Sequence, residues 1–271
     1  MSFDLCQVRL ASKPYFIKNI NTNIYSIEEL CYYLYGNVYL IDETIVNEGL
    51  CDWIREELDL KRLGRNLSDQ LEKGSGIAAF VMPIFREIGY LSPKQMKAYQ
   101  EALGRLEVQP EDARAKLKGD YLVGSGMFQA AVNEYRRILD RQGPGGGGAA
   151  FYSEIWNNLG CAFARMFRFE QAADCFRKAW KLSRTKETLR KYVSVLPLYM
   201  SQEEYRQTLS RLGADEELIR LIQEYNKSLG EHARMLNEQR KRSELEPEKE
   251  LELLKEDYRR SSRCVLSTEN S

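Results

Sequence analysis

The chain has 271 residues, of which 43% are hydrophobic and 30% are charged, as is normal for a soluble helical protein. Lys plus Arg equals Asp plus Glu at 40 each, so the chain as a whole has no electrostatic preference for nucleic acid or for a membrane surface. The charge is uneven, because residues 1–60 hold 4 basic and 10 acidic side chains. This acidic segment argues against a nucleic-acid-reading head and predicts no nucleic-acid partner.

The cysteines and the single histidine exclude the usual metal and cofactor sites. The six cysteines are scattered without a CxxC pair, and with one histidine, His232, a zinc site would need thiolates from distant parts of the chain. We therefore expect no metal and no cofactor, and cysteines that act as small buried hydrophobes in a reducing cytosol. The N-terminus lacks a signal-like pattern, and the longest apolar run, residues 77–85, is too short to span a bilayer. These features predict a cytoplasmic protein with no membrane partner.

Residues 1–109 are predicted to form an N-terminal helical domain of four or five short helices. Residues 3–10 alternate too weakly to decide between a strand and an extended arm. Ser26 and Glu29 have the spacing of a capping box, and Ser92-Pro93 begins another helix. Further helices are expected at about 47–60 and 77–88, the second with Pro83 as a kink or as part of a short first turn.

A group of tyrosines surrounds the first of these helices and supports two interpretations. Exposed tyrosines are common at protein interfaces, so this face could bind a partner. Alternatively, the tyrosines pack under the next segment and close the end of the helical array, which is the interpretation that we favour. The tyrosines concerned are Tyr25, Tyr32, Tyr33, Tyr35 and Tyr39.

Residues 110–212 contain two helical pairs with matching patterns, separated by a glycine-rich insertion at 143–148. In the second pair, bulky and small residues alternate at helical spacing over residues 151–184. The first pair repeats this spacing at a constant offset of 41 residues, and the insertion accounts for the length beyond a period of about 34. The matching positions are Ala115, Gly119, Leu122, Ala131, Tyr135 and Ile138 in the first pair, and Trp156, Gly160, Phe163, Ala172, Phe176 and Ala179 in the second.

The second pair resembles one tetratricopeptide (TPR) repeat, because these positions and Leu159 agree with the signature of that family. Only Arg184 departs, standing where proline is usual. The resemblance implies an all-α protein with an α-solenoid of helix-turn-helix pairs. It also implies that a side chain at Gly160 would enter the contact between the paired helices.

The C-terminal part is predicted to contain a degenerate third pair and then long helices. The third pair covers about 185–212, with Pro197 ending or kinking its first helix. Residues 213–271 form a long helix, a charged helix and a disordered tail. Apolar residues from Leu218 to Leu236 are spaced 4-3-4-3-4, a coiled-coil-like seam through which the chain could form a homo-oligomer.

The TPR resemblance also implies a peptide-binding groove lined by the first helix of each pair. On that concave face we expect Lys116, Asp120, Asn157, Asn158, Arg165, Arg190 and Lys191. Lys116, Asn158 and one of Arg190 or Lys191 are placed like the clamp with which some TPR modules hold a terminal carboxylate. Asp120 departs from that clamp and would repel a carboxylate. Ordinary solvated polar side chains are the alternative interpretation of this set.

Together these patterns predict a non-catalytic protein- or peptide-binding scaffold or adaptor, similar to a co-chaperone. The alternative is a regulatory protein whose N-terminal domain senses a ligand or contacts nucleic acid. Its two helices within residues 26–58 are acidic, which phosphate repulsion disfavours. An enzyme is not expected, because the glycine-rich insertion lacks the Lys and Ser/Thr of a phosphate loop and His232 has no convergent partners.

Overall fold

The structure is a computed structural model that describes residues 9–141, 147–212 and scattered residues between 219 and 255. The described chain is mostly helical and divides into two compact units, residues 1–199 and 200–271. The predicted boundaries near 109 and 212 remain predictions. No helix in the described part of the chain is both long enough and apolar enough to cross a membrane.

A two-stranded ribbon, which the sequence did not predict, precedes the first helix. Strands β1 (Tyr15–Ile17) and β2 (Thr22–Ile24) pair antiparallel, with Tyr15 opposite Ile24. A short 3-10 turn, η1 (Lys18–Ile20), connects them, and Asn21 completes the connection with a φ of 51°. Strands of three residues contain too few positions to show an alternating pattern, which is why sequence periodicity missed them.

Helix α1 (Ile27–Gly36) begins at the predicted capping box. The Ser26 hydroxyl accepts a hydrogen bond from the Glu29 amide at 3.2 Å, and the Glu29 carboxylate accepts one from the Ser26 amide at 3.3 Å. Leu30 and Leu34 are fully buried, as their helical spacing predicts. The capping prediction is confirmed at this helix.

Four more helices complete the N-terminal helical region, as expected from the sequence: α2 (Glu48–Glu56), α3 (Lys61–Glu72), α4 (Gly76–Glu87) and α5 (Pro93–Glu107). Helix α2 ends before the predicted Leu60, because Asp59 has a φ of 58°, which a helix does not accommodate. Pro83 lies inside α4, and the predicted Ser92 cap begins α5. A 3-10 turn, η2 (Val38–Leu40), lies between α1 and α2.

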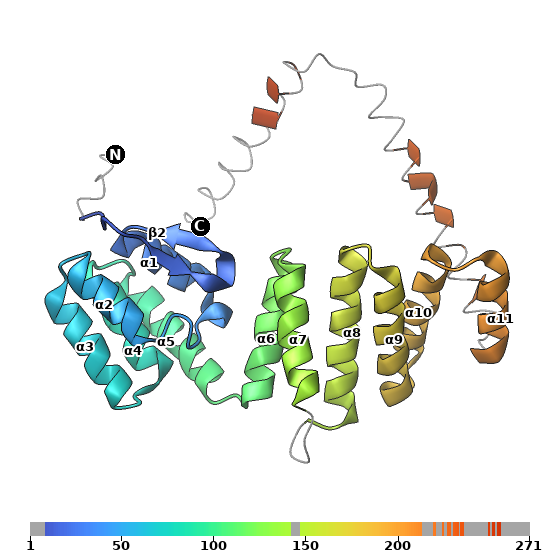
Figure 1. Ribbon diagram of the computed structural model, residues 1–271, viewed down its shortest axis with the longest axis horizontal. Coiled ribbons are helices and arrows are strands. Elements are labelled where there is room, and N and C mark those ends of the chain that lie inside the picture. The colour runs from blue at the N-terminus through green and yellow to red at the C-terminus, as the bar shows by residue number, and fades with distance from the viewer. Residues whose placement is uncertain are drawn as a thin grey trace. The chain divides into compact units, whose positions relative to one another are not determined.

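Five helices then lie side by side in chain order, each packed on the next (Figure 1). They are α6 (Glu111–Gly124), α7 (Phe128–Asp140), α8 (Ala149–Arg165), α9 (Phe169–Ser183) and α10 (Lys186–Val195). Twelve of the thirteen predicted repeat positions, which are the six of each pair and Leu159, are buried, and Trp156 is half-buried. The 3-10 turn η3 (Leu196–Leu198), which contains Pro197, follows α10.

Small residues allow the paired helices to approach closely. A Cβ added at Gly119 would lie 2.5 Å from the Tyr135 ring, and one added at Gly160 would lie 2.7 Å from the Phe176 ring. Real Cβ atoms do not come this close to ring carbons, so a side chain at either position would force the ring or the helix to shift. The contact predicted at Gly160 is therefore present, and Gly119 has the same contact in the first pair.

A buried ion cluster connects the segment after η2 to the first helical pair. Lys118 is 2.6 Å from Asp42 and 2.7 Å from Glu134, and its side chain is only 11% exposed. Arg137 lies 3.0 Å from the same Glu134 carboxylate. Because a lone buried charge is costly, each of these groups depends on the others, and the cluster joins the N-terminal helical region to α6 and α7.

The predicted tyrosine face is divided between the interior and the surface. Tyr33 is buried, and Tyr39 packs on Tyr121 of α6 with ring centroids 5.9 Å apart. The Tyr121 hydroxyl donates a hydrogen bond to the Gly36 carbonyl at 2.9 Å. Tyr32, by contrast, is 75% exposed. Part of the face therefore covers the first helical pair, as the capping interpretation expects, and part faces solvent.

The second unit begins with α11 (Gln202–Leu212). Ser201 caps this helix, because its hydroxyl accepts a hydrogen bond from the Glu204 amide at 3.3 Å and its own amide donates one to the Glu204 carboxylate at 2.9 Å. The predicted seam from Leu218 to Leu236 lies almost entirely outside the described residues. Of the six residues predicted to form the seam, the structure describes His232 alone, and its side chain is exposed. The seam stays a prediction.

Candidate binding face

The first helices of successive pairs, α6, α8 and α10, share a face on which five of the seven predicted groove residues are joined by hydrogen bonds. Lys116 donates to Asp120 at 2.9 Å, and Asn158 donates to the other oxygen of Asp120 at 2.7 Å. Asn157 donates to Asn158 at 2.9 Å, and Lys191 donates to Asn157 at 3.0 Å. These contacts form one polar chain across three helices, which we call the polar network.

Helical spacing and helix packing both contribute to this network. Lys116 and Asp120 are four residues apart on α6, so their side chains meet on one face. The Tyr135 hydroxyl, from α7, also donates to Asp120 at 2.6 Å. Burial and the neighbouring Asp120 carboxylate together raise the pKa of Tyr135, so the phenol remains a donor. Asp120 therefore accepts three hydrogen bonds, which gives it a structural role.

The polar network neutralises most of its own charge. Lys116 lies 2.9 Å from Asp120 and 3.5 Å from Glu154, and Lys191 lies 3.1 Å from Glu187. Burial alone would lower the pKa of Lys116, but the hydrogen bond and charge of Asp120 outweigh it and raise that pKa. Both lysines therefore already have anionic partners, and the clamp stays a prediction.

The two predicted arginines lie outside the polar network and line a neighbouring cavity. This cavity has a volume of about 350 Å³ and lies between α8, α9, α10 and η3. Its apolar wall includes Phe176, Val195 and Leu198, and Arg165 and Arg190 contribute the charge together with Lys191. Both arginine side chains are exposed, and neither forms an ion pair with any residue that the structure describes. We call this the arginine cavity.

Cys161 lies in the arginine cavity but has no sign of catalytic activation. Burial raises the pKa of its thiol, and the positive charges of Lys191 and Arg165 only partly oppose this effect. A protonated thiol is a poor nucleophile. Among the described residues, no group of His, Cys, Asp and Glu has an arrangement that could hold a metal ion. The cations and the apolar wall of the arginine cavity are chemically suited to an anionic, partly apolar segment.

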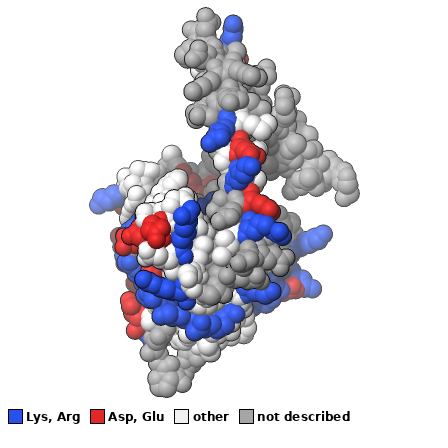
Figure 2. Space-filling view, turned by 90° about the vertical axis from the view of Figure 1, so that its right-hand side faces the viewer, with Lys and Arg blue, Asp and Glu red and all other residues white. Residues whose placement is uncertain are grey.

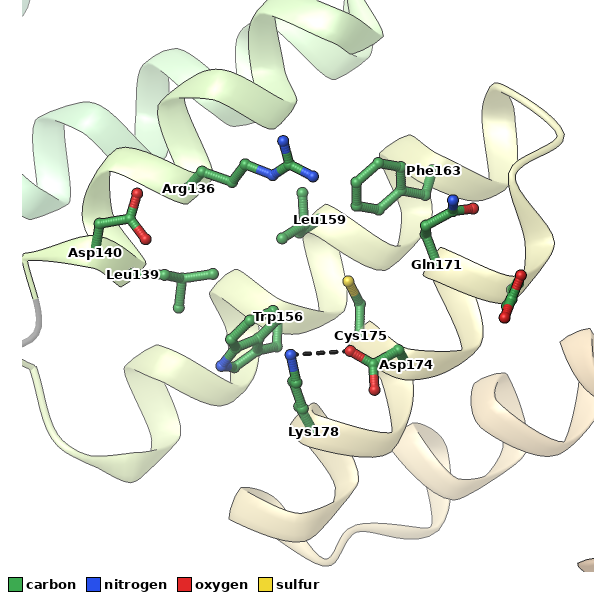
Figure 3. Close-up of a pocket in the computed structure, with 11 residues that line it drawn as sticks. Arg136, Leu139, Asp140, Trp156, Leu159, Phe163, Gln171, Asp174, Cys175 and Lys178 are labelled. Atoms are coloured by element: carbon green, nitrogen blue, oxygen red, sulfur yellow. Dashed lines mark ion pairs between the residues drawn. The ribbon is translucent and has the colours of Figure 1, made fainter.

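A second hollow lies on another side of the pairs, between α7, α8 and α9 (Figure 3), with a volume of about 460 Å³. The Lys178 ammonium lies 4.2 Å from the centre of the Trp156 ring and 2.9 Å from Asp174. Arg136 extends toward Phe163, with 5.6 Å between the guanidinium carbon and the ring centre. Charges of both signs line this hollow, so it favours no ligand class. Its position depends on packing between pairs, which sequence spacing cannot show.

The last part of the first unit is strongly basic. Residues 165–199 contain nine Lys and Arg but only three Asp and Glu. In the view of Figure 2, Lys and Arg cover more of the visible surface than Asp and Glu do. Three of these cations, Arg165, Arg190 and Lys191, line the arginine cavity, and their positive charge would attract an acidic ligand.

Comparison with known proteins gave no relative from which a ligand could be inferred. The chain matches no protein-family model, no curated protein and no solved structure.

Proposed function

We propose that this chain is a non-catalytic scaffold that binds an acidic segment of a partner protein in the arginine cavity. The observation that carries the proposal is the pair of exposed arginines, Arg165 and Arg190, which lack ion-pair partners beside an apolar wall. The neighbouring lysines are already paired with Asp120, Glu154 and Glu187. Unpaired positive charge on this face is therefore concentrated at the arginines.

The chemistry of the arginine cavity favours a peptide with both carboxylates and apolar side chains. A guanidinium presents several donors in a planar fork that fits a carboxylate, and such charge-assisted hydrogen bonds are strong. Phe176, Val195 and Leu198 offer apolar surface beside it. An acidic side chain or a terminal carboxylate would lie on the arginines while a neighbouring apolar side chain covers the wall.

The TPR resemblance supports the same proposal, because TPR-like solenoids bind extended peptides along their first helices. Under this proposal α6–α7 and α8–α9 are two such repeats, and α10 begins a degenerate third pair. The four cysteines of the described chain are free thiols, which is compatible with the cytoplasmic setting that we propose. Compared with the clamp expected from the resemblance, the proposed site is moved from α6 toward α10.

A peptide-binding experiment on the full chain tests this function. Labelled acidic decapeptides, each made with a free and with an amidated C-terminus, would be titrated with the protein and followed by fluorescence anisotropy. We expect Arg165→Ala with Arg190→Ala to weaken binding by about tenfold or more, since two charge-assisted contacts are lost. Lys116→Ala should change it little. Lys181→Ala, which removes an exposed cation on α9, is the matched control.

Two results would contradict the proposal. Undiminished binding by the double arginine variant would show that the arginine cavity is not the site. Equal losses in the Lys181→Ala control would show that only the general positive charge of this end matters. If amidation of the C-terminus weakens binding, the bound group is the terminal carboxylate. If amidation leaves the affinity unchanged, the bound groups are acidic side chains.

A further inference from the structure

A second, oppositely charged pocket lies in the N-terminal helical region, far along the chain from the arginine cavity. It has a volume of about 430 Å³, within the range of ligand pockets, and is formed by β2, α1 and the residues after α4. Three tyrosines contribute to its walls, Tyr32, Tyr33 and Tyr90. Its lining includes two glutamates but no Lys, Arg or His. We call it the tyrosine pocket.

The two glutamates of the tyrosine pocket differ in whether their carboxylates have hydrogen-bond partners. Glu29 is occupied, because its carboxylate accepts the amides of Tyr25 at 2.5 Å and Ser26 at 3.3 Å in the capping box. Glu28 has no hydrogen bond and no ion pair to its carboxylate from any described residue, and its Oε2 is fully buried. A carboxylate that is partly withdrawn from water and unpaired is costly, and a cationic ligand would remove that cost.

Aromatic walls beside an unpaired carboxylate are suited to one ligand class in particular. The faces of tyrosine rings attract ammonium groups, and an apolar wall can cover the methylene stem of a long cationic side chain. Tyr32 is 75% exposed and available for such contact. A metal ion is a poorer fit. Calcium and magnesium ions need several oxygen ligands, and the carboxylate of Glu29 already accepts hydrogen bonds in the capping box.

The geometry points to the tyrosine pocket as a binding site for an alkylammonium group, presented as the lysine side chain of a partner protein. The charge of the surrounding segment supports this occupant, since described residues 9–60 contain nine Asp and Glu against four Lys and Arg. The inference does not depend on the arginine cavity. With both sites, the first unit would bind a basic element at its acidic end and an acidic element at its basic end.

Titration of the isotope-labelled full chain, followed by NMR, tests the tyrosine pocket. The probes are N-acetyl-lysine methylamide, its neutral ε-acetylated form, n-butylammonium and a lysine-containing pentapeptide. We expect the lysine probe to shift resonances of α1 and Tyr90, and the ε-acetylated form to have no effect, because it carries no charge. The pentapeptide should bind more tightly than n-butylammonium if the ligand is a partner's lysine. The reverse order would contradict that source and identify a small free amine.

Matched variants connect the binding to the proposed contacts. Glu28→Gln keeps the shape of the side chain and should weaken the lysine probe by about tenfold, since it removes the charge opposite the ammonium. Tyr32→Ala should also weaken it, and Tyr32→Phe should retain it, because the ring is what contacts the cation. Glu56→Gln removes an acid that is 71% exposed outside the tyrosine pocket and should have no effect.

The inference is overturned if no alkylammonium probe binds, if ε-acetyl-lysine binds as well as lysine, or if Glu28→Gln binds like the unaltered chain. Thermal melting of each variant separates a lost contact from a lost fold. Glu28 and Tyr32 are suitable for this purpose, because neither side chain forms a hydrogen bond to another described residue.

Discussion

The two helical pairs α6–α7 and α8–α9 share their helix spacing but differ in the chemistry placed on it. In both, a glycine of the first helix lies against an aromatic ring of the second, at equivalent positions 41 residues apart. Around this contact the first pair is polar. Lys118 and Glu134 form its buried ion pair, whereas Leu159 and Cys175 occupy the equivalent positions of the second pair.

The same contrast explains where the arginine cavity lies. Asp120 and Tyr135 of the first pair correspond to Cys161 and Phe176 of the second. The first two are hydrogen-bonded to each other, and the second two line the arginine cavity. The same arrangement of paired helices thus accommodates either an internal polar network, as in the first pair, or an open apolar wall, as in the second. The side chains at a few equivalent positions decide which one forms, and substitutions that exchange them test this view.

The largest effect is expected from Lys118→Leu, which places in the first pair the leucine that the second pair has at the equivalent position, Leu159. Asp42 and Glu134 would lose their shared counter-ion, so we expect stability to fall by about 3–5 kcal/mol in urea unfolding. The triple variant Asp42→Asn, Lys118→Leu, Glu134→Gln removes all three charges and should recover most of the loss. A single variant as stable as the unaltered chain would show that the ion cluster contributes no net stability.

The same cluster predicts how stability depends on pH. Burial alone would raise the pKa of Asp42, but hydrogen bonds from Lys118 and Thr44 outweigh it and hold that pKa below its usual 3.8. A lowered pKa stabilises the fold above 3.8, and this contribution is lost as pH falls through the lower, folded-state pKa. Urea unfolding at stepped pH should show a smaller acid loss in the triple variant. Identical acid profiles would exclude Asp42 as the cause.

Alanine at the contact glycines should give the next largest effect, a loss of about 1–3 kcal/mol from overpacking. Gly119→Ala should cost more than Gly160→Ala, because the hydroxyl of Tyr135 is held by Asp120 and its ring cannot move aside. Leucine at either position should cost more still. Gly104→Ala is the control, since nothing lies within 4 Å of its added Cβ. Urea midpoints that are unchanged in both contact variants would contradict the close helix contact.

Tyr135→Phe makes the first pair resemble the second at its aromatic position. The change removes one of the three hydrogen bonds to Asp120, and we expect a loss of about 1 kcal/mol in urea unfolding. Phe176→Tyr is the reciprocal change. The new hydroxyl would have no carboxylate to bind, because Cys161 stands at the position equivalent to Asp120. The change should not stabilise the fold. A stabilised Phe176→Tyr variant would mean that the polar network is not specific to the first pair.

The smallest effect concerns the turn inside each pair. Gly126 in the first turn has a φ of 75°, and its equivalent in the second turn, Phe167, has a φ of 60° and is 81% exposed. Left-handed backbone is unfavourable for residues other than glycine, so Phe167→Gly should stabilise by about 0.5 kcal/mol after the flexibility of glycine is subtracted. Gly126→Ala should destabilise. Differential scanning calorimetry would measure both shifts, and shifts of the same sign would contradict this account.

Local sequence determined the helices and their caps. The serine caps of α1 and α5 and the matched spacing around Gly119 and Gly160 involve residues within one or two helices, so periodicity and capping chemistry could predict them. The end of α2 before Asp59 and the ribbon of β1 and β2 were missed. One depends on the conformation of a single residue, and the other on strands too short to show a period.

Only the tertiary structure decided which charged side chains remain free. By sequence, Lys116, Lys191, Arg165 and Arg190 were all candidates. Each lysine also contacts a residue of the neighbouring helix α8, Lys116 at Glu154 and Lys191 at Asn157, whereas neither arginine forms an ion pair with a described residue. Sequence spacing could not predict the pairing of the buried Lys118 either, because its partner Asp42 lies 76 residues away along the chain. A charge is free or neutralised according to what lies within a few ångströms of it, and helix packing sets those neighbours.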